Sequence, residues 1–141
     1  MVALVVVFAF FISAQEKHHR AYEQLTRSFI LSDELRQSSD DLTRMVRTYV
    51  ATGNPRFKAQ FQEILDIRDG KAPRPWQLGD IYWDLVLDDS QRPVASGPPA
   101  ALLDLMRQAG FTPAEFSLLN EAKTASDALT RIEFAAMALI E

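Results

Sequence analysis

The amino-acid sequence begins with an apolar stretch that runs into a long pattern of helical spacing. Residues 2–14 contain a single polar residue, Ser13, and residues 15–52 contain neither proline nor glycine. In the second stretch, apolar or small residues recur at alternating steps of four and three, as in a heptad repeat. These residues are Leu31, Leu35, Ser38, Leu42, Met45 and Tyr49. The pattern predicts one long helix over about residues 3–52 that packs along its side.

Turn signals predict several short helices after the long one. Gly53 is typical of a helix end, and Asn54 followed by Pro55 is typical of a helix start. The apolar residues that follow share one face and predict a second helix that begins at Pro55. Prolines then predict loops on both sides of a short helix that begins near Asp80, and a further helix ends at Gly110.

The last part of the chain has the most regular heptad pattern. Thr112, Pro113 and Glu115 are typical of a capped helix start, because Glu115 completes a capping box. The apolar line that follows consists of Leu118, Ala122, Ala125, Leu129, Ile132, Ala136 and Leu139. We expect this line to face the first helix. Residues of about 3–52 and 113–141 are then the long helices of an all-α antiparallel helical bundle, with a cap of short helices.

Composition and charge exclude several classes of function. The chain has 141 residues, enough for one domain, and its net charge of −4 provides no basic face for nucleic acid. It has no cysteine, which excludes disulfides and thiol chemistry. His18 and His19 are adjacent and point about 100° apart on a helix, so they do not share a metal as i, i+4 histidines do. We therefore expect no metal, no cofactor and no enzymatic activity within these residues.

Three interpretations fit the apolar start of the chain. Residues 2–14 are fewer than the roughly 20 apolar residues of a spanning helix, but the residues after them continue at helical spacing without a break. The favoured interpretation is a partial transmembrane helix over residues 1–14 whose beginning lies outside the sequence. The alternatives are a cleaved signal peptide and a buried helix. Lys17 and Arg20 run against an extracytoplasmic position of the following residues, because basic residues favour the cytoplasmic side.

Several segments together resemble the helical extracytoplasmic sensor region of bacterial transmembrane receptors. The segments are LRQSSDDLTRMVRTYVATGNPRF at residues 35–57, FQEILDIRDGKAPRP, IYWDLV and LLDLMRQAGFTPAEFSLLNEAKTASDALTRIEFAAM. The resemblance is one of overall pattern and covers roughly residues 10–141. The receptors of this kind include sensor histidine kinases, chemoreceptors, and nucleotide or diguanylate cyclases.

The resemblance implies a role in signal transduction, as in two-component or chemotaxis receptors. Residues 15–141 would form a ligand-sensing domain in the periplasm, truncated before the segments that lead to an output module. Residues 2–14 would anchor it in the bacterial inner membrane. A small molecule would displace one long helix against the other, and a homodimer is expected. The alternative is a membrane-anchored helical adaptor that binds a partner protein.

Both tryptophans of the chain lie in one short segment that proline and glycine interrupt. Aromatic rings and one charge of each sign come together there, which predicts a ligand-binding site. The candidate residues are Arg74, Trp76, Tyr82, Trp83 and Asp84. In the alternative interpretation, the rings close one end of the bundle as ordinary core. Ser38, a small polar residue on the first heptad line, either leaves room for a ligand or allows two helices to pack closely.

Overall fold

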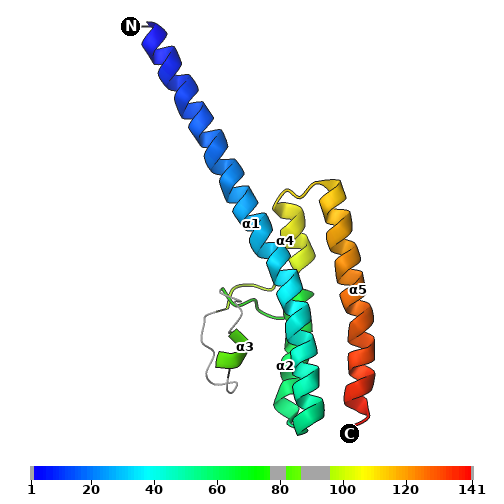
Figure 1. Ribbon diagram of the computed structural model, residues 1–141. Coiled ribbons are helices and arrows are strands. Elements are labelled where there is room, and N and C mark those ends of the chain that lie inside the picture. Colours follow the sequence, from blue (N-terminus) through cyan, green and yellow to red (C-terminus); the bar gives the residue numbers. More distant parts are fainter. Residues whose placement is uncertain (1, 77–81, 87–95, 141) are drawn as a thin grey trace.

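The computed structural model of the chain is all-α (Figure 1). It describes residues 2–76, 82–86 and 96–140. The helices within these residues are α1 (Val2–Thr52), α2 (Pro55–Arg68), α3 (Tyr82–Leu85), α4 (Leu102–Gln108) and α5 (Pro113–Ala138). The predicted all-α helical bundle, in which two long helices pack against each other, is confirmed. The predicted antiparallel direction of the two long helices is wrong: α2 already returns along α1, so α5 starts beside the middle of α1 and runs in the same direction as α1. The predicted start of the short helix at Asp80 lies outside the described residues.

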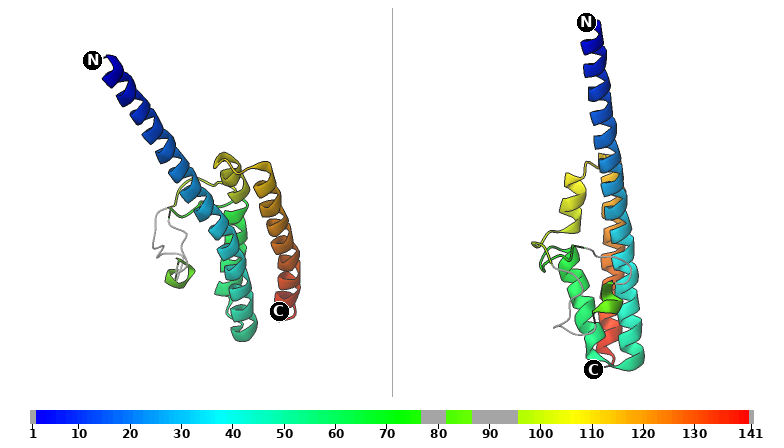
Figure 2. Two further views of the ribbon diagram at one scale, coloured as in Figure 1. Left: turned by 45° about the horizontal axis from the view of Figure 1, so that its top comes forward. Right: turned by 90° about the vertical axis from the view of Figure 1, so that its left-hand side faces the viewer.

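The two long helices lie side by side in one layer, and α2 and α4 cover one face of that layer (Figure 2). α2 runs along the C-terminal part of α1, and α4 lies next to the middle of α1. α5 runs parallel to α1 and ends near the turn between α1 and α2 (Figure 1), so residues paired across the two helices rise in number together, as in Ser39 with Ser126 and Thr43 with Glu133. The N-terminal part of α1 projects beyond the rest of the chain.

Neighbouring side chains explain where α2 and α5 begin. Asn54 accepts a hydrogen bond from the backbone N–H of Arg56 at 3.1 Å, and proline follows Asn54 at the first helical position. The hydroxyl of Thr112 accepts from the backbone N–H of Glu115, and the Glu115 carboxylate accepts from the backbone N–H of Thr112 at 2.8 Å. The predicted capping box is therefore present, and both caps satisfy backbone donors that a helix start leaves open.

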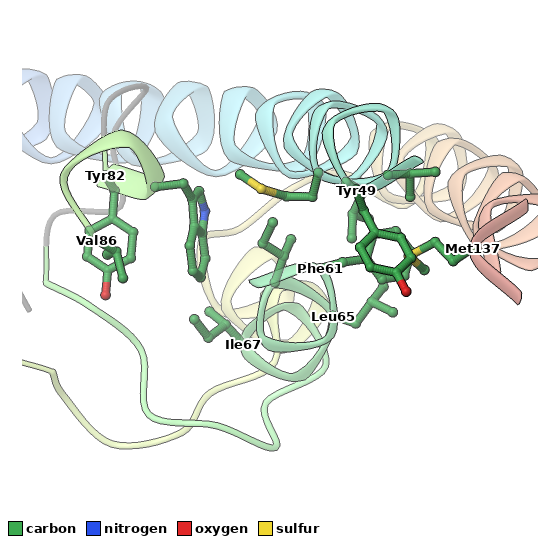
Figure 3. Packing of buried hydrophobic residues seen from close by; sticks show 12 residues of the cluster. Tyr49, Phe61, Leu65, Ile67, Tyr82, Val86 and Met137 are labelled. Carbon is green, nitrogen blue, oxygen red and sulfur yellow. The ribbon is translucent and has the colours of Figure 1, made fainter. Parts of the chain in front are cut away.

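The core consists of two clusters along α1. The larger cluster packs α1, α2, α3 and the end of α5 around Phe61, which is fully buried (Figure 3). The smaller cluster packs Leu31 and Leu35 of α1 against Leu102 and Met106 of α4. Burial of apolar surface contributes about 25 cal/mol per Å². These two clusters therefore hold α2 and α4 on the same side of α1.

The predicted heptad line of α5 faces α1 only in part: Ala122, Ala125 and Leu129 border a groove together with Leu35 of α1, whereas the two ends of the line turn away from α1. Leu118, Ile132 and Leu139 are 65%, 67% and 88% exposed. The residues of α5 that are buried instead include Thr130 and Glu133. α5 is turned in this way because its inner side makes ion pairs and hydrogen bonds to α1 and α2, which an apolar line does not offer. Exposed apolar residues are thus left at both ends of this line.

The apolar start of the chain forms the first turns of α1. The helix continues from Val2 to Thr52 without interruption. Among the described residues, no helix holds an apolar stretch of the length that a bilayer crossing requires.

Gly70→Ala is expected to destabilise the protein more than Gly53→Ala. Both glycines follow a helix with positive φ, +72° and +66°, which costs an L-residue roughly 1–2 kcal/mol. A methyl group at Gly70 would also lie 2.5 Å from the backbone nitrogen of Ala101, whereas at Gly53 it meets no atom within 4 Å. Urea unfolding should show the extra loss for Gly70→Ala, and equal losses would contradict the close approach of Ala101.

Candidate functional site

The predicted aromatic residues separate into a buried pair and an exposed ring. Tyr82 and Trp83 lie in α3 and are both buried, with their rings edge to face at a centroid distance of 5.0 Å. Trp76 is 72% exposed and lies close to Gly97 instead. The three rings therefore do not form one cage. The burial of Tyr82 and Trp83 agrees with the alternative in which these two rings belong to the core.

Hydrogen bonds from α2 hold the end of α3 in place. The carbonyl oxygen of Val86 accepts from Arg56 Nη2 at 2.5 Å and from Gln60 Nε2 at 3.1 Å. The Val86 and Tyr82 side chains belong to the same buried cluster as Ile67 of α2 (Figure 3). These contacts fix the position of the neighbouring indole ring relative to α2.

The two charged candidates pair with residues of α1. Arg74 forms an ion pair with Glu34, and both side chains are largely buried. Asp84 forms an ion pair with Arg44, whose second nitrogen donates to Asp41 at 2.7 Å. The predicted site residues Arg74 and Asp84 thus connect the aromatic segment to two carboxylates on α1.

Those two carboxylates line an enclosed pocket between α1, α2 and α3. Its lining residues are Glu34, Gln37, Ser38, Asp41, Ile64, Ile67, Arg68 and Trp83. The cavity volume is about 10 Å³, which leaves room for about one water molecule. Of the predicted ligand-binding residues, Trp83 is the one that borders the pocket.

Arg68 is the most deeply buried charge of the pocket. Its side chain is 2% exposed, and it donates to Ser126 at 2.9 Å and to Asp127 at 2.8 Å. Its Nε is buried and has no hydrogen-bond partner among the described residues. A buried donor without a partner costs roughly 1–3 kcal/mol. An oxygen atom within hydrogen-bonding distance of Nε would remove that cost.

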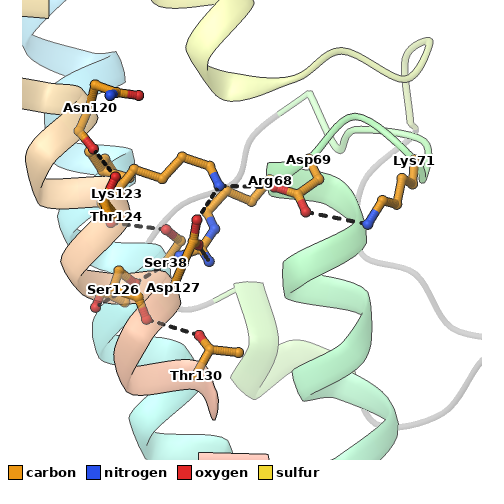
Figure 4. A network of polar contacts seen from close by, with 12 residues as sticks. Ser38, Arg68, Asp69, Lys71, Asn120, Lys123, Thr124, Ser126, Asp127 and Thr130 are labelled. Atoms are coloured by element: carbon orange, nitrogen blue, oxygen red, sulfur yellow. Dashed lines mark hydrogen bonds and ion pairs between the residues drawn. The ribbon is translucent and has the colours of Figure 1, made fainter. Parts of the chain in front are cut away.

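A polar network around Arg68 joins the three longest helices (Figure 4). Lys123 of α5 lies 3.3 Å from Asp69 at the end of α2 and 2.8 Å from Asp127. The hydroxyl of Ser126 donates to Ser39 of α1 at 3.2 Å. One wall of the pocket is therefore linked through Arg68 to both long helices.

Burial changes the acidity of the two pocket carboxylates. Desolvation raises the pKa of Glu34, although Arg74 acts in the opposite direction. Desolvation also raises the pKa of Asp41, against the hydrogen bond and charge of Arg44. Each carboxylate is thus easier to protonate than an exposed one, and each gains from a donor that enters the pocket.

The pocket contains the groups of a binding site for a small polar molecule. Glu34 and Asp41 accept hydrogen bonds, Arg68 Nε donates one, and Trp83 with Ile64 offers apolar surface. Ser38 also lines the pocket, and its hydroxyl donates to the backbone of its own helix and not to a side chain that could act as a base. Among the described residues, no group of three or more acidic, histidine or cysteine side chains is placed to hold a metal ion.

The prediction from sequence did not include Glu34, Asp41 and Arg68, which line this pocket. Glu34 and Asp41 are seven positions apart, and Ser38 lies between them on the same face of α1. This spacing beside the heptad line was a usable signal for a polar stripe toward the core. Arg68 gave no such signal, because its partners lie far away in the sequence, on α5.

Comparison with known proteins adds no family assignment. No family model, no curated protein and no solved structure matches the chain. The function is therefore inferred from the geometry of the pocket and of the two long helices.

The contribution of Glu34 to stability is expected to rise as the pH falls toward the ordinary carboxyl range of about 4–4.5. The raised pKa of Glu34 means that the folded state binds this proton more tightly than the unfolded chain, so its contribution is lost as pH rises through the folded pKa. Glu34→Gln should flatten this part of the stability–pH curve, and the exposed control Glu121→Gln should not. Chemical unfolding at several pH values measures both, and an unchanged slope in Glu34→Gln would contradict the assignment.

Proposed function

We propose that this chain is the ligand-sensing domain of a membrane-anchored bacterial signal-transduction receptor. The observation that carries the proposal is the pocket beneath Trp83, where two carboxylates and an unpartnered Arg68 nitrogen are buried between helices. A buried donor without a partner is uncommon in a structure that serves packing alone. Such polar groups are typical of small-molecule sites.

The proposed ligand is a small neutral or zwitterionic molecule, such as a short amino acid or amino alcohol. Each charge near the pocket already has a partner of opposite sign within the chain. A ligand with a net charge would disturb this balance. An oxygen of the ligand would accept from Arg68 Nε, and a donor of the ligand would bind Asp41, whose raised pKa reflects poor solvation.

Binding and helix displacement are coupled in this proposal by the size of the pocket. The present space holds about one water molecule. A larger ligand therefore requires α1 to move away from α2 and α3, and this movement is the signal. We propose that residues 2–14 anchor α1 in the inner membrane, that the bundle lies in the periplasm, and that the receptor works as a homodimer.

Tryptophan fluorescence tests the proposal, because the two tryptophans are separated. Trp76→Phe leaves Trp83 at the pocket as the one fluorophore of its kind. We expect a member of a panel of amino acids, short amines and hydroxy acids to change the emission of this variant and to raise its melting temperature.

Two further variants distinguish binding in the pocket from binding elsewhere. Arg68→Met should abolish the response, since Met has no donor, and Glu121→Gln, which is exposed on α5 and outside the pocket, should preserve it. A panel without any response, or a response that survives Arg68→Met, would overturn the proposal.

The adaptor function is a second candidate, favoured by the exposed apolar line on α5. An adaptor would bind a partner protein along α5 and would show no response of Trp83 to small molecules. The fluorescence experiment therefore separates the two functions.

A further inference from the structure

Among the described residues, helices cover the layer of α1 and α5 on one face only. α2 and α4 lie on one side of it, as the right-hand view of Figure 2 shows. Between the two long helices runs an open groove of about 480 Å³, lined in part by Leu35, Leu119, Ala122, Ala125 and Leu129. A helix that is apolar along one side normally buries that side against another element. The open face of the layer therefore requires an occupant.

On α5 the open face carries the heptad line. Leu118, Ile132 and Leu139 are all largely exposed, while Thr130 and Glu133 occupy the inner side. Steps of four and three over this length are typical of a helix that packs against another helix. Within the described residues, no helix covers this line.

On α1 the open face is apolar toward both ends. Tyr22, Leu25 and Phe29 are exposed and follow one another at steps of three and four. The same spacing leads on to Arg36 at the rim of the groove and puts these residues on one face. Val50, farther along α1, is also exposed.

Hydrogen bonds across the layer set the level of α1 against α5. They run from Ser126 to Ser39 at 3.2 Å and from Thr43 to Glu133 at 2.9 Å, between partners 87 and 90 positions apart. Because α1 and α5 run in the same direction, residues about 87 to 90 positions apart lie at the same level. Phe29 and Leu118 are 89 positions apart, and so are Val50 and Leu139. The exposed apolar residues of the two helices therefore lie at matching levels.

We propose that a second copy of this chain covers the open face, in a parallel dimer with a four-helix core of α1, α5 and their copies. A two-fold axis along the helices puts α1 of each copy opposite α5 of the other, so Phe29 meets the partner subunit's Leu118. Parallel pairing also brings together the two projecting parts of α1, where Tyr22 and Leu25 are largely exposed within the part of the chain that the structure describes. The interface follows from the open face, whereas its parallel direction also rests on the proposed membrane receptor.

The size of the face fits a stable dimer. α5 has 26 residues and is about 39 Å long, and two adjacent helices are about 20 Å wide. The face thus measures roughly 800 Å², which is about the area that each partner contributes to a standard stable interface. The rim also carries both charges, Arg36 and Asp40, within one turn of each other. These two charges pair with each other within the chain, so together they bring no net charge to the interface.

Sedimentation of the full chain in mild detergent tests the interface. The unaltered chain should sediment with the mass of two chains. Leu129→Glu places a charge in the groove and should raise the dissociation constant at least tenfold, whereas Asn120→Glu on the outer side of α5 should not change it. Circular dichroism confirms that both variants remain helical. A monomeric unaltered chain at about 100 μM, or equal association of both variants, would overturn the proposal.

Cysteine cross-linking tests the parallel direction, and the absence of native cysteine makes it clean. A mixture of the Phe29→Cys chain and a tagged Leu118→Cys chain should give a disulfide-linked mixed dimer on oxidation. Each variant alone should cross-link much less. A mixture that gives no mixed dimer would overturn this part of the inference, whether or not Phe29→Cys cross-links with itself.

The two proposals fail independently. Leu129 lies outside the pocket beneath Trp83. A Leu129→Glu monomer that keeps the fluorescence response would show a sensor whose interface is disrupted. A dimer without any fluorescence response would keep the interface and remove the sensing function.

Discussion

Phe61→Ala is expected to lower the free energy of unfolding by about 3–5 kcal/mol. The ring of Phe61 is fully buried in the cluster where α1, α2 and α5 meet. It also packs edge to face against Phe134 of α5, at a centroid distance of 5.0 Å. Its removal would leave a cavity between three helices that cannot close without moving α5.

Urea unfolding of Phe61→Ala should show a lower midpoint with a similar m-value, because the folded state stays compact. Phe57→Ala is the matched control, since Phe57 lies on the same helix but packs at the edge of the cluster. Its loss should be clearly smaller. If both variants lose the same free energy, Phe61 is not the centre of the core.

Asp127→Asn is expected to cost about 3 kcal/mol, near the lower end of the range for a broken buried ion pair. The loss arises because Arg68 stays charged and 2% exposed, while an asparagine at position 127 keeps an acceptor oxygen but supplies no opposite charge. Asp127 itself is 42% exposed, so water offsets part of the loss.

Arg68→Met should cost clearly less than Asp127→Asn. Methionine fills much of the same space without a buried charge, and Asp127 keeps its ion pair with Lys123 at 2.8 Å. Thermal and urea unfolding of the two variants give the comparison. A larger loss in Arg68→Met would mean that the hydrogen bonds of Arg68 contribute more than the desolvation of its charge costs.

The helices were predictable because their signals are local. The proline-free run before Thr52 and the capping box at Thr112 are each contained in the segment that they control. The orientation of α5 was not predictable in this way. A heptad line shows that Leu118 and Ile132 share a face, but it does not show what covers that face. The inner side of α5 is held by polar contacts to distant residues, such as Glu133 with Thr43.

The candidate site was predictable only in part. Trp83 was identified from the cluster of aromatic residues, and it borders the pocket. Glu34 was missed because its burial depends on Arg74, which lies 40 positions later in the chain. A charged residue is buried where the folded chain supplies a partner, and the distance between partners along the sequence hides this from local patterns.

The projecting part of α1 acts as a lever arm. Contacts with the rest of the chain begin near Gln24, which donates a hydrogen bond to the carbonyl oxygen of Gly110 at 3.2 Å. The residues before this point extend for about 33 Å at 1.5 Å per residue. If the bundle tilts this helix by about one degree, its tip swings by roughly 0.6 Å over that length. A small change in the angle of α1 near Gln24 therefore gives a displacement that grows with distance toward the N-terminal end of the helix.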